Sequence, residues 1–90
     1  MITLKDFFGM TTDTQRITID YDDTETYHRV YEGYNLTSNS LEAMASIRNE
    51  YIENADQYIV VIMAAVNSIL NVVIMDKSEY ENEVKRNKGI

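Results

Sequence analysis

The chain contains no cysteine, no proline and no tryptophan, and only three glycines among 90 residues. Without cysteine it can form neither a disulfide nor a thiolate metal site, which is typical of proteins in a reducing cytoplasm. Gly9, Gly33 and Gly89 lie too far apart to form a phosphate-cradling or dinucleotide-binding loop. The first residues lack the charged lead and long apolar core of a signal peptide. We therefore predict a cytoplasmic protein without a cofactor.

Positive charge is also scarce, since eight basic residues stand against fifteen acidic ones and give a net charge of −7. Direct binding to nucleic acid or to anionic membranes is therefore unfavourable. We expect instead a protein partner with a basic surface. The hydrophobic fraction of 44% and the charged fraction of 26% argue against wholesale disorder. Ninety residues suffice for a single domain, residues 1–90.

Alternating polarity predicts a first β-hairpin. From Gln15 to Tyr21, apolar residues occupy every second position, as in a half-buried strand. Residues 22–25 form a polar turn, and residues 26–32 should return beside the first strand. The sequence does not decide which side of this second strand is buried, because Tyr27 and Tyr31 fall on one side and His28 and Val30 on the other. Gly33 and Asn35 are expected to end it.

Three segments have helical patterns. Thr3 can cap a short helix that ends at Gly9, with Leu4, Phe7 and Phe8 on one face. A capping box at residues 39–42 opens a longer middle helix that runs to residue 55. A second capping box, at residues 78–81, opens a terminal helix that ends at Gly89.

The stretch from Tyr58 to Met75 is almost wholly apolar and allows three interpretations: a membrane-spanning helix, a buried helix, or a hairpin turning at Asn67 and Ser68. The hairpin is favoured because the stretch is rich in β-branched residues, and because Asn67 tolerates the positive φ of a tight turn. Together the elements predict an α+β fold: a four-stranded antiparallel sheet with a middle helix and short terminal helices.

Residues suited to catalysis or metal binding are sparse. His28 is the only histidine and has no evident nucleophile to serve. The acidic run from Asp20 to Glu25 fails the calcium-loop pattern, because Glu25 stands in place of glycine and Tyr31 in place of the bidentate glutamate. We therefore predict neither an enzyme nor a metal site.

Tyrosines interleaved with acids in the first hairpin are typical of a protein-binding surface, because tyrosine brings large contact area and a polar tip. Asp20 and Asp22 would lie about 6.7 Å apart on one strand face and could imitate adjacent phosphates. The alternative is that the rings simply cover the sheet. The predicted partner-binding residues are Asp20, Tyr21, Asp22, Asp23, Glu25, Tyr27, Tyr31, Glu32 and Tyr34.

The second hairpin would be apolar on both faces, and one helix covers only one of them. Apolar patches of that size usually mark interfaces. We therefore predict a homodimer, with self-association residues Val60, Ile62, Ile69, Val73 and Met75.

Three stretches carry a resemblance to a known group of proteins: residues 2–8 (ITLKDFF), 17–20 (ITID) and 67–74 (NSILNVVI). In these, the chain resembles short accessory proteins of phages and mobile elements of low-GC Gram-positive bacteria. Some small acidic proteins of this kind are anti-CRISPR inhibitors, which bind an effector nuclease and block its DNA-binding surface. The resemblance implies a non-enzymatic inhibitor of a nucleic-acid-handling protein. The alternatives are a self-associating structural or assembly subunit and a small single-span membrane protein.

Overall fold

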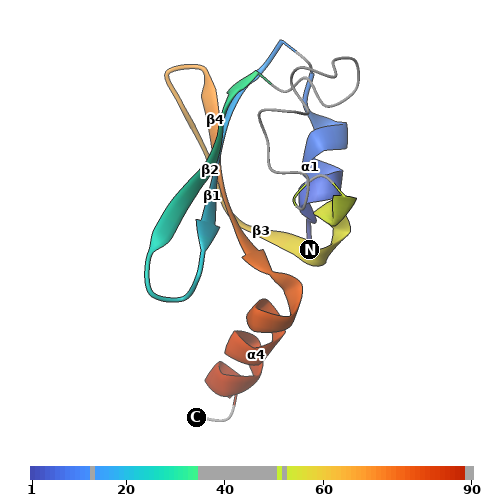
Figure 1. Cartoon of the computed structure of the whole chain (residues 1–90), viewed down its shortest axis with the longest axis vertical. Helices are drawn as coiled ribbons and strands as arrows, with labels where there is room; N and C mark the ends of the chain where they lie inside the picture. The colour runs from blue at the N-terminus through green and yellow to red at the C-terminus, as the bar shows by residue number, and fades with distance from the viewer. Residues whose placement is uncertain (13, 35–50, 52, 89–90) are drawn as a thin grey trace.

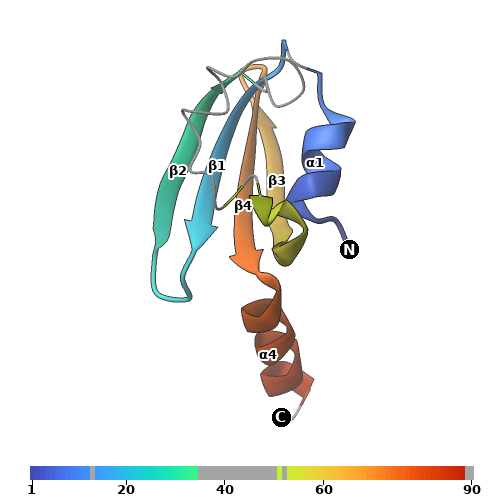
Figure 2. The ribbon, with the colours of Figure 1, turned by 45° about the vertical axis from the view of Figure 1, so that its right-hand side comes forward.

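The computed structural model describes residues 1–12, 14–34, 51 and 53–88. Their elements are the helix α1 (Leu4–Met10), the strands β1 (Arg16–Asp22) and β2 (Tyr27–Tyr34), the 3₁₀ turn η1 (Ala55–Gln57), the strands β3 (Tyr58–Val66) and β4 (Ile69–Asp76), and the helix α4 (Lys77–Lys88). The strands form one sheet in the order β2-β1-β4-β3. Helix α1 lies against one face of the sheet, and α4 projects from its end (Figures 1 and 2). The predicted α+β class is confirmed.

The prediction of an all-antiparallel sheet is wrong, because the sheet is mixed. β1 pairs with β2, and β3 with β4, in two antiparallel hairpins, but the central strands β1 and β4 are parallel. It follows that β2 and β3 run in the same direction, so the end of β2 and the start of β3 lie at opposite ends of the sheet.

The predicted middle helix lies largely outside the described residues. At its expected end, Tyr51 and Glu53 are helical, and Ala55 begins the 3₁₀ turn η1. Tyr51 and Ala55 are both buried, and they belong to the same core cluster as α1 and the central strands.

The apolar stretch forms β3 and β4, so the hairpin interpretation is confirmed and the single-helix interpretations are wrong. Asn67 and Ser68 adopt φ values of 53° and 66°. Two successive residues of positive φ are the signature of a type I′ turn, whose twist matches that of the flanking strands. Within the described part of the chain, no helix has the length and apolar character needed to cross a membrane.

A β-bulge in β2 determines which of its side chains lie on the α1 side of the sheet. Ile19 pairs with Tyr31 but Asp20 pairs with Arg29, so Val30 is the extra residue. Each extra residue reverses the alternation of side chains beyond it. Tyr31 therefore shares the α1 side of the sheet with Ile19, whereas Tyr27, opposite Asp22, lies on the other side.

The core lies between α1 and the central strands. Thr3 caps α1 as predicted and forms a full capping box with Asp6, with both hydrogen bonds at 3.1 Å. The helix runs through Gly9 to Met10. Gly9 therefore does not end it as predicted. The fully buried side chains of this core are Phe7, Leu4, Ile17, Ile19, Ile74 and Val72.

The opposite face of the sheet, which no described helix spans, is called the open face here. By the strand register it carries Arg16, Thr18, Asp20 and Asp22 of β1, with Tyr27, Arg29, Glu32 and Tyr34 of β2 beside them. Its other half is uncharged and carries Ile59, Ile62, Ala64, Val66, Ile69, Asn71, Val73 and Met75, of which Ile59, Val73 and Met75 are buried. Thr18, which is buried, donates through its hydroxyl to the side-chain oxygen of Asn71 at 2.6 Å and joins the two halves.

Helix α4 begins at Lys77, two residues earlier than predicted, because Asp76 and not Ser78 is its cap. The carboxylate of Asp76 accepts from the backbone N–H of Ser78 at 2.9 Å and from its hydroxyl at 2.5 Å. Asp76 therefore caps the helix, and these bonds lower its pKa. The last residue of β4 is thereby also the helix cap, which fixes where α4 leaves the sheet.

Candidate functional site

The turn between β1 and β2, called here the hairpin tip (residues 22–27), is built by its own carboxylates. Asp22 accepts from the backbone N–H of Thr24 at 2.8 Å. Asp23 accepts from the N–H groups of Glu25 at 2.9 Å and Thr26 at 2.8 Å. Aspartates stabilise tight turns in this way because their short side chains reach backbone groups two or three residues ahead. The tip therefore presents negative charge in a fixed geometry, and it lies away from α1 (Figure 1).

Asp23 is also paired with the only histidine, since His28 Nε2 lies 2.5 Å from Asp23 Oδ2. The backbone N–H of Thr26 is the largest cause of a lowered pKa at Asp23, followed by His28 and then the N–H of Glu25. Together they bring the pKa from 3.8 to about 2. Asp23 is therefore ionised at any physiological pH.

The lowered pKa of Asp23 predicts acid sensitivity in a defined window. A carboxylate with a folded pKa of about 2 and an unfolded pKa of 3.8 stabilises the fold above about pH 4 and loses this contribution as the pH falls through 2. Asp23→Asn keeps the shape of the side chain without the charge. We expect the difference in free energy of unfolding between wild type and Asp23→Asn to shrink from pH 4 to pH 2 in urea titrations. An equal difference at pH 6 and at pH 2 would contradict this cause.

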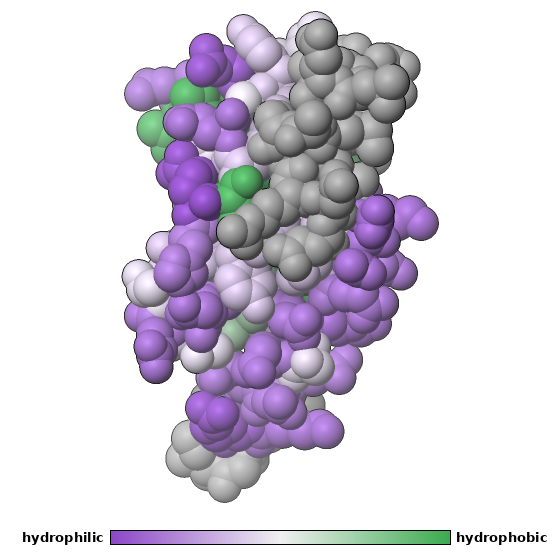
Figure 3. Space-filling model, in the orientation of Figure 1, coloured by the Kyte–Doolittle hydropathy of each residue, from purple (hydrophilic) through white to green (hydrophobic). Residues whose placement is uncertain are grey.

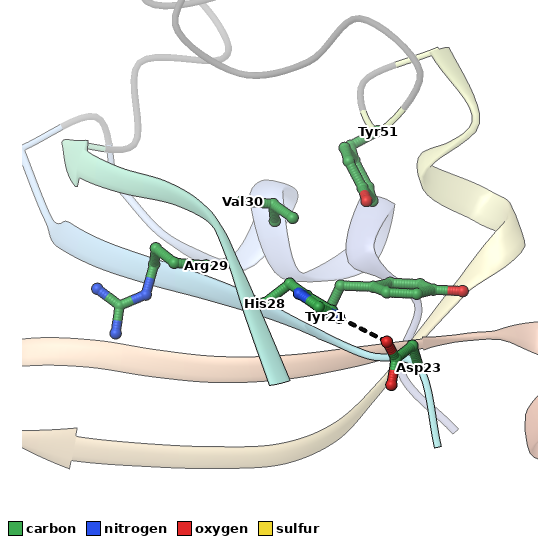
Figure 4. Close-up of a pocket in the computed structure, with 6 residues that line it drawn as sticks. All are labelled: Tyr21, Asp23, His28, Arg29, Val30 and Tyr51. Atoms are coloured by element: carbon green, nitrogen blue, oxygen red, sulfur yellow. Dashed lines mark hydrogen bonds and ion pairs between the residues drawn. The ribbon is translucent and has the colours of Figure 1, made fainter. Parts of the chain in front are cut away.

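A hollow of 520 Å³ lies beside the tip and is lined by Tyr21, Asp23, His28, Arg29, Val30 and Tyr51 (Figure 4). In this view the guanidinium of Arg29 points away from the His28–Asp23 pair. Burial raises the pKa of Tyr21, with Asp76 adding to the effect, so its phenol is not activated. None of the described lining residues is a serine, cysteine or lysine. Among them, His28 has no activated nucleophile beside it.

Two of the lining residues, Tyr21 and Tyr51, belong to a cluster of aromatic rings with Tyr58. Tyr21 packs edge-on against Tyr58 with ring centroids 6.0 Å apart, and Tyr51 lies 5.0 Å from Tyr58. Such tilted contacts are the preferred geometry for aromatic pairs. Tyr21, one of the predicted partner-binding residues, is therefore half-buried and holds β1 against the chain that precedes β3.

The acids further along the hairpin are neutralised within the protein. Asp20 accepts from Arg29 Nε at 2.6 Å, and Arg29 also reaches Glu32 at 3.4 Å. The carboxylate of Asp20 raises the pKa of Arg29. Asp20 and Asp22 do share the open face as predicted, but Asp20 is paired with a cation and Asp22 holds the turn. Within the first hairpin, the carboxylates without an arginine partner therefore lie at the hairpin tip.

The predicted tyrosine surface is divided between the two faces. Tyr27 is 53% exposed and Tyr34 48% exposed. The guanidinium of Arg16 lies over the Tyr34 ring, 5.4 Å from its centroid. Tyr31, by contrast, is buried in the core, where its hydroxyl donates to the backbone carbonyl of Tyr34. Of the four tyrosines, only Tyr27 and Tyr34 are placed to meet a partner.

The predicted self-association residues are likewise dispersed. Ile62 is 46% exposed and Ile69 is partly buried, but Val73 and Met75 are buried within the sheet. A second bulge, at Val61, places Val60 opposite Ile74 on the α1 side.

Sequence reasoning left out Met63 and Val66, which are 42% and 55% exposed. The signal that could have found them is their position near the turn of a hairpin whose first strand lies at the edge of the sheet.

No group of three histidine, aspartate or glutamate side chains within the described residues is placed to hold a metal ion. A search for relatives gave no match to any protein-family model, curated protein or solved structure.

Proposed function

We propose that the chain is a non-enzymatic protein-interaction module that binds the basic surface of a nucleic-acid-handling protein through its hairpin tip. An inhibitor encoded by a phage or mobile element, acting on a CRISPR effector nuclease in the host cytoplasm, is the most concrete form. Such nucleases hold nucleic acid in a positively charged channel. An acidic protein that occupies this channel excludes the nucleic acid by competition.

The observation that carries the proposal is the preorganised acidic tip. Asp22 and Asp23 accept hydrogen bonds from backbone N–H groups, which fixes their position. The pKa of Asp23 is lowered to about 2, so its carboxylate is ionised at neutral pH. Fixed charges lose little side-chain entropy on binding, so more of their attraction to a basic partner is retained. Tyr27 ends the tip with an exposed ring, the residue type most enriched at interfaces.

Charge reversal at Glu25 tests this proposal. The side chain of Glu25 is exposed at the tip, and only its backbone N–H is used by the turn. Glu25→Lys should therefore leave the fold intact and weaken inhibition by about tenfold, with a larger effect at low salt than at high salt. The measurement is DNA binding by guide-loaded CRISPR effector nucleases in mobility-shift assays, with increasing amounts of the protein.

Glu81→Lys is the matched control, because Glu81 is exposed on α4 and its reversal changes the net charge equally, from −7 to −5 as one acid becomes one base. It should inhibit like the wild type. Equal loss in both variants would show that only net charge matters and would contradict a site at the tip. Absence of inhibition for every effector tested at low salt would contradict the CRISPR form of the proposal.

A self-associating structural or assembly subunit is the second candidate. It is favoured by one feature, the uncharged and exposed second half of β3. The two candidates use opposite edges of the sheet, so one chain can serve both.

A further inference from the structure

The strand β3 forms one edge of the sheet, and its second half is exposed on both faces. Every residue from Ile62 to Val66 is exposed, and the larger side chains among them are Ile62, Met63 and Val66. Some hydrophobic atoms are visible among hydrophilic ones at the upper left of Figure 3, near where Figure 1 places the tip of the β3–β4 hairpin. No strand among the described residues other than β4 pairs with this half of β3. An edge of this kind presents N–H and C=O groups to another strand.

The first half of β3 is already occupied. Thr3 forms a bridge with Ile59, and the N–H of Val60 donates to the carbonyl of Ile2 at 2.8 Å. The bulge at Val61 then separates this covered half from the free half. The opposite edge strand, β2, carries Arg29 and Glu32, and charged side chains of this kind are used by proteins to block edge pairing. The free half of β3 carries no charge and no proline.

The hairpin fixes which backbone groups of β3 face outward. The residues that flank a two-residue turn form a hydrogen-bonded pair, and successive residues then alternate in direction. The backbone N–H and C=O groups of Val66 therefore point toward β4, while those of Ala65 and Met63 point outward, away from the sheet. Val60, beyond the bulge, also faces outward, in agreement with its bond to Ile2.

We infer that two copies of the chain pair β3 against β3 in antiparallel orientation, around a two-fold axis at Ala64. Met63 of each copy then faces Ala65 of the other, and these two pairs exchange four hydrogen bonds. On the open face, Ile62 lies opposite Val66 of the other copy, and the two Ala64 side chains meet at the axis. The three exposed apolar side chains are thus covered by one contact.

A second copy fits this edge better than an unrelated chain for two reasons. A two-fold interface must be self-complementary, and here each large side chain meets a small or medium one across the axis. The chain also carries a net charge of −7, which opposes contact between copies elsewhere, whereas the stretch from Tyr58 to Met75 has no charge. The pairing is independent of the hairpin tip.

The contact spans one short strand segment and covers less than the roughly 800 Å² per partner of a standard interface. We therefore expect a dimer that forms at micromolar concentration. Because both free edges are consumed, the association stops at two copies.

Single cysteines test the register, since the chain contains none of its own. Across the proposed axis, two residues 64 face each other as a non-hydrogen-bonded pair with Cα atoms about 4.5 Å apart, within the range for a disulfide. Two residues 65 would lie on the diagonal, about 7–8 Å apart. Under mild oxidation, Ala64→Cys should form at least about ten times more covalent dimer than its matched control Ala65→Cys.

Sedimentation equilibrium supplies the second measurement. The wild type should be a dimer at high micromolar concentration, and Ala64→Lys should be a monomer because two like charges meet at the axis. Asn82→Lys, which adds the same charge on an exposed position of α4, should remain a dimer. Equal cross-linking of the two cysteine variants, a monomeric wild type at about 100 μM, or a ladder of higher oligomers would each overturn the inference.

Discussion

Phe7→Ala is expected to lower the free energy of unfolding by about 3–5 kcal/mol, the usual cost of removing a buried aromatic ring. Phe7 is fully buried and is the largest such side chain in the described core. It joins α1 to the central strands β1 and β4. Since small domains are stable by only about 5–15 kcal/mol, this variant should unfold at a much lower urea concentration, as measured by circular dichroism.

Met10→Ala provides the control within the same helix, because Met10 is 62% exposed. Its effect should stay within about 0.5 kcal/mol, as for most surface substitutions. Similar losses in both variants would mean that α1 is not held by its buried face.

Gly33→Ala is expected to lower the free energy of unfolding by about 1–3 kcal/mol. Gly33 has a φ of 155°, which side-chain-bearing residues rarely adopt, and a Cβ atom there would lie 2.9 Å from the Tyr31 hydroxyl oxygen and 3.3 Å from Tyr31 Cζ. The Tyr31 ring covers this glycine and its hydroxyl donates to the carbonyl of Tyr34. The added methyl group would displace a buried ring that closes the end of β2.

The same substitution at Gly9 should have the opposite sign. Gly9 lies inside α1, and a Cβ atom there meets nothing within 4 Å. Gly9→Ala is therefore expected to stabilise the protein by about 0.5–1 kcal/mol, because alanine favours the helix. Thermal unfolding of the two variants side by side checks both signs, and destabilisation by Gly9→Ala would contradict the assigned extent of α1.

Local patterns were sufficient to predict most elements of this fold. Alternation from Gln15 to Tyr21 predicted β1, and the β-branched residues around Asn67 and Ser68 predicted the second hairpin. These features act over a few residues, where the identity of the residue determines the backbone conformation. The cap of α4 was predicted wrongly at Ser78, although an aspartate directly before a helical pattern also favours the N-cap position, and Asp76 occupies it.

Long-range features were not predictable in the same way. The parallel pairing of β1 with β4 depends on the path of the chain between β2 and β3, which no short pattern encodes. The bulges at Val30 and Val61 reverse the side-chain alternation without any glycine or proline to mark them. As a result, Tyr27 and Tyr31, four residues apart, lie on opposite faces, and the predicted binding surface is divided.

The sequence was sufficient to predict which segment carries the candidate site, but not which side chains pair with one another there. The acids of the first hairpin were evident from composition. Their partners were not, because the pairing of Asp20 with Arg29 and of Asp23 with His28 depends on the strand register. The register decides which charges are balanced internally and which are available to a partner.

Hydrogen exchange of the chain in complex with the nuclease whose DNA binding it blocks tests the central claim most directly. Amides of residues 22–27 should exchange more slowly in the complex, while those of α4 should be unchanged. Slower exchange confined to α4 or to β3, with the hairpin tip unaffected, would contradict binding through the acidic tip.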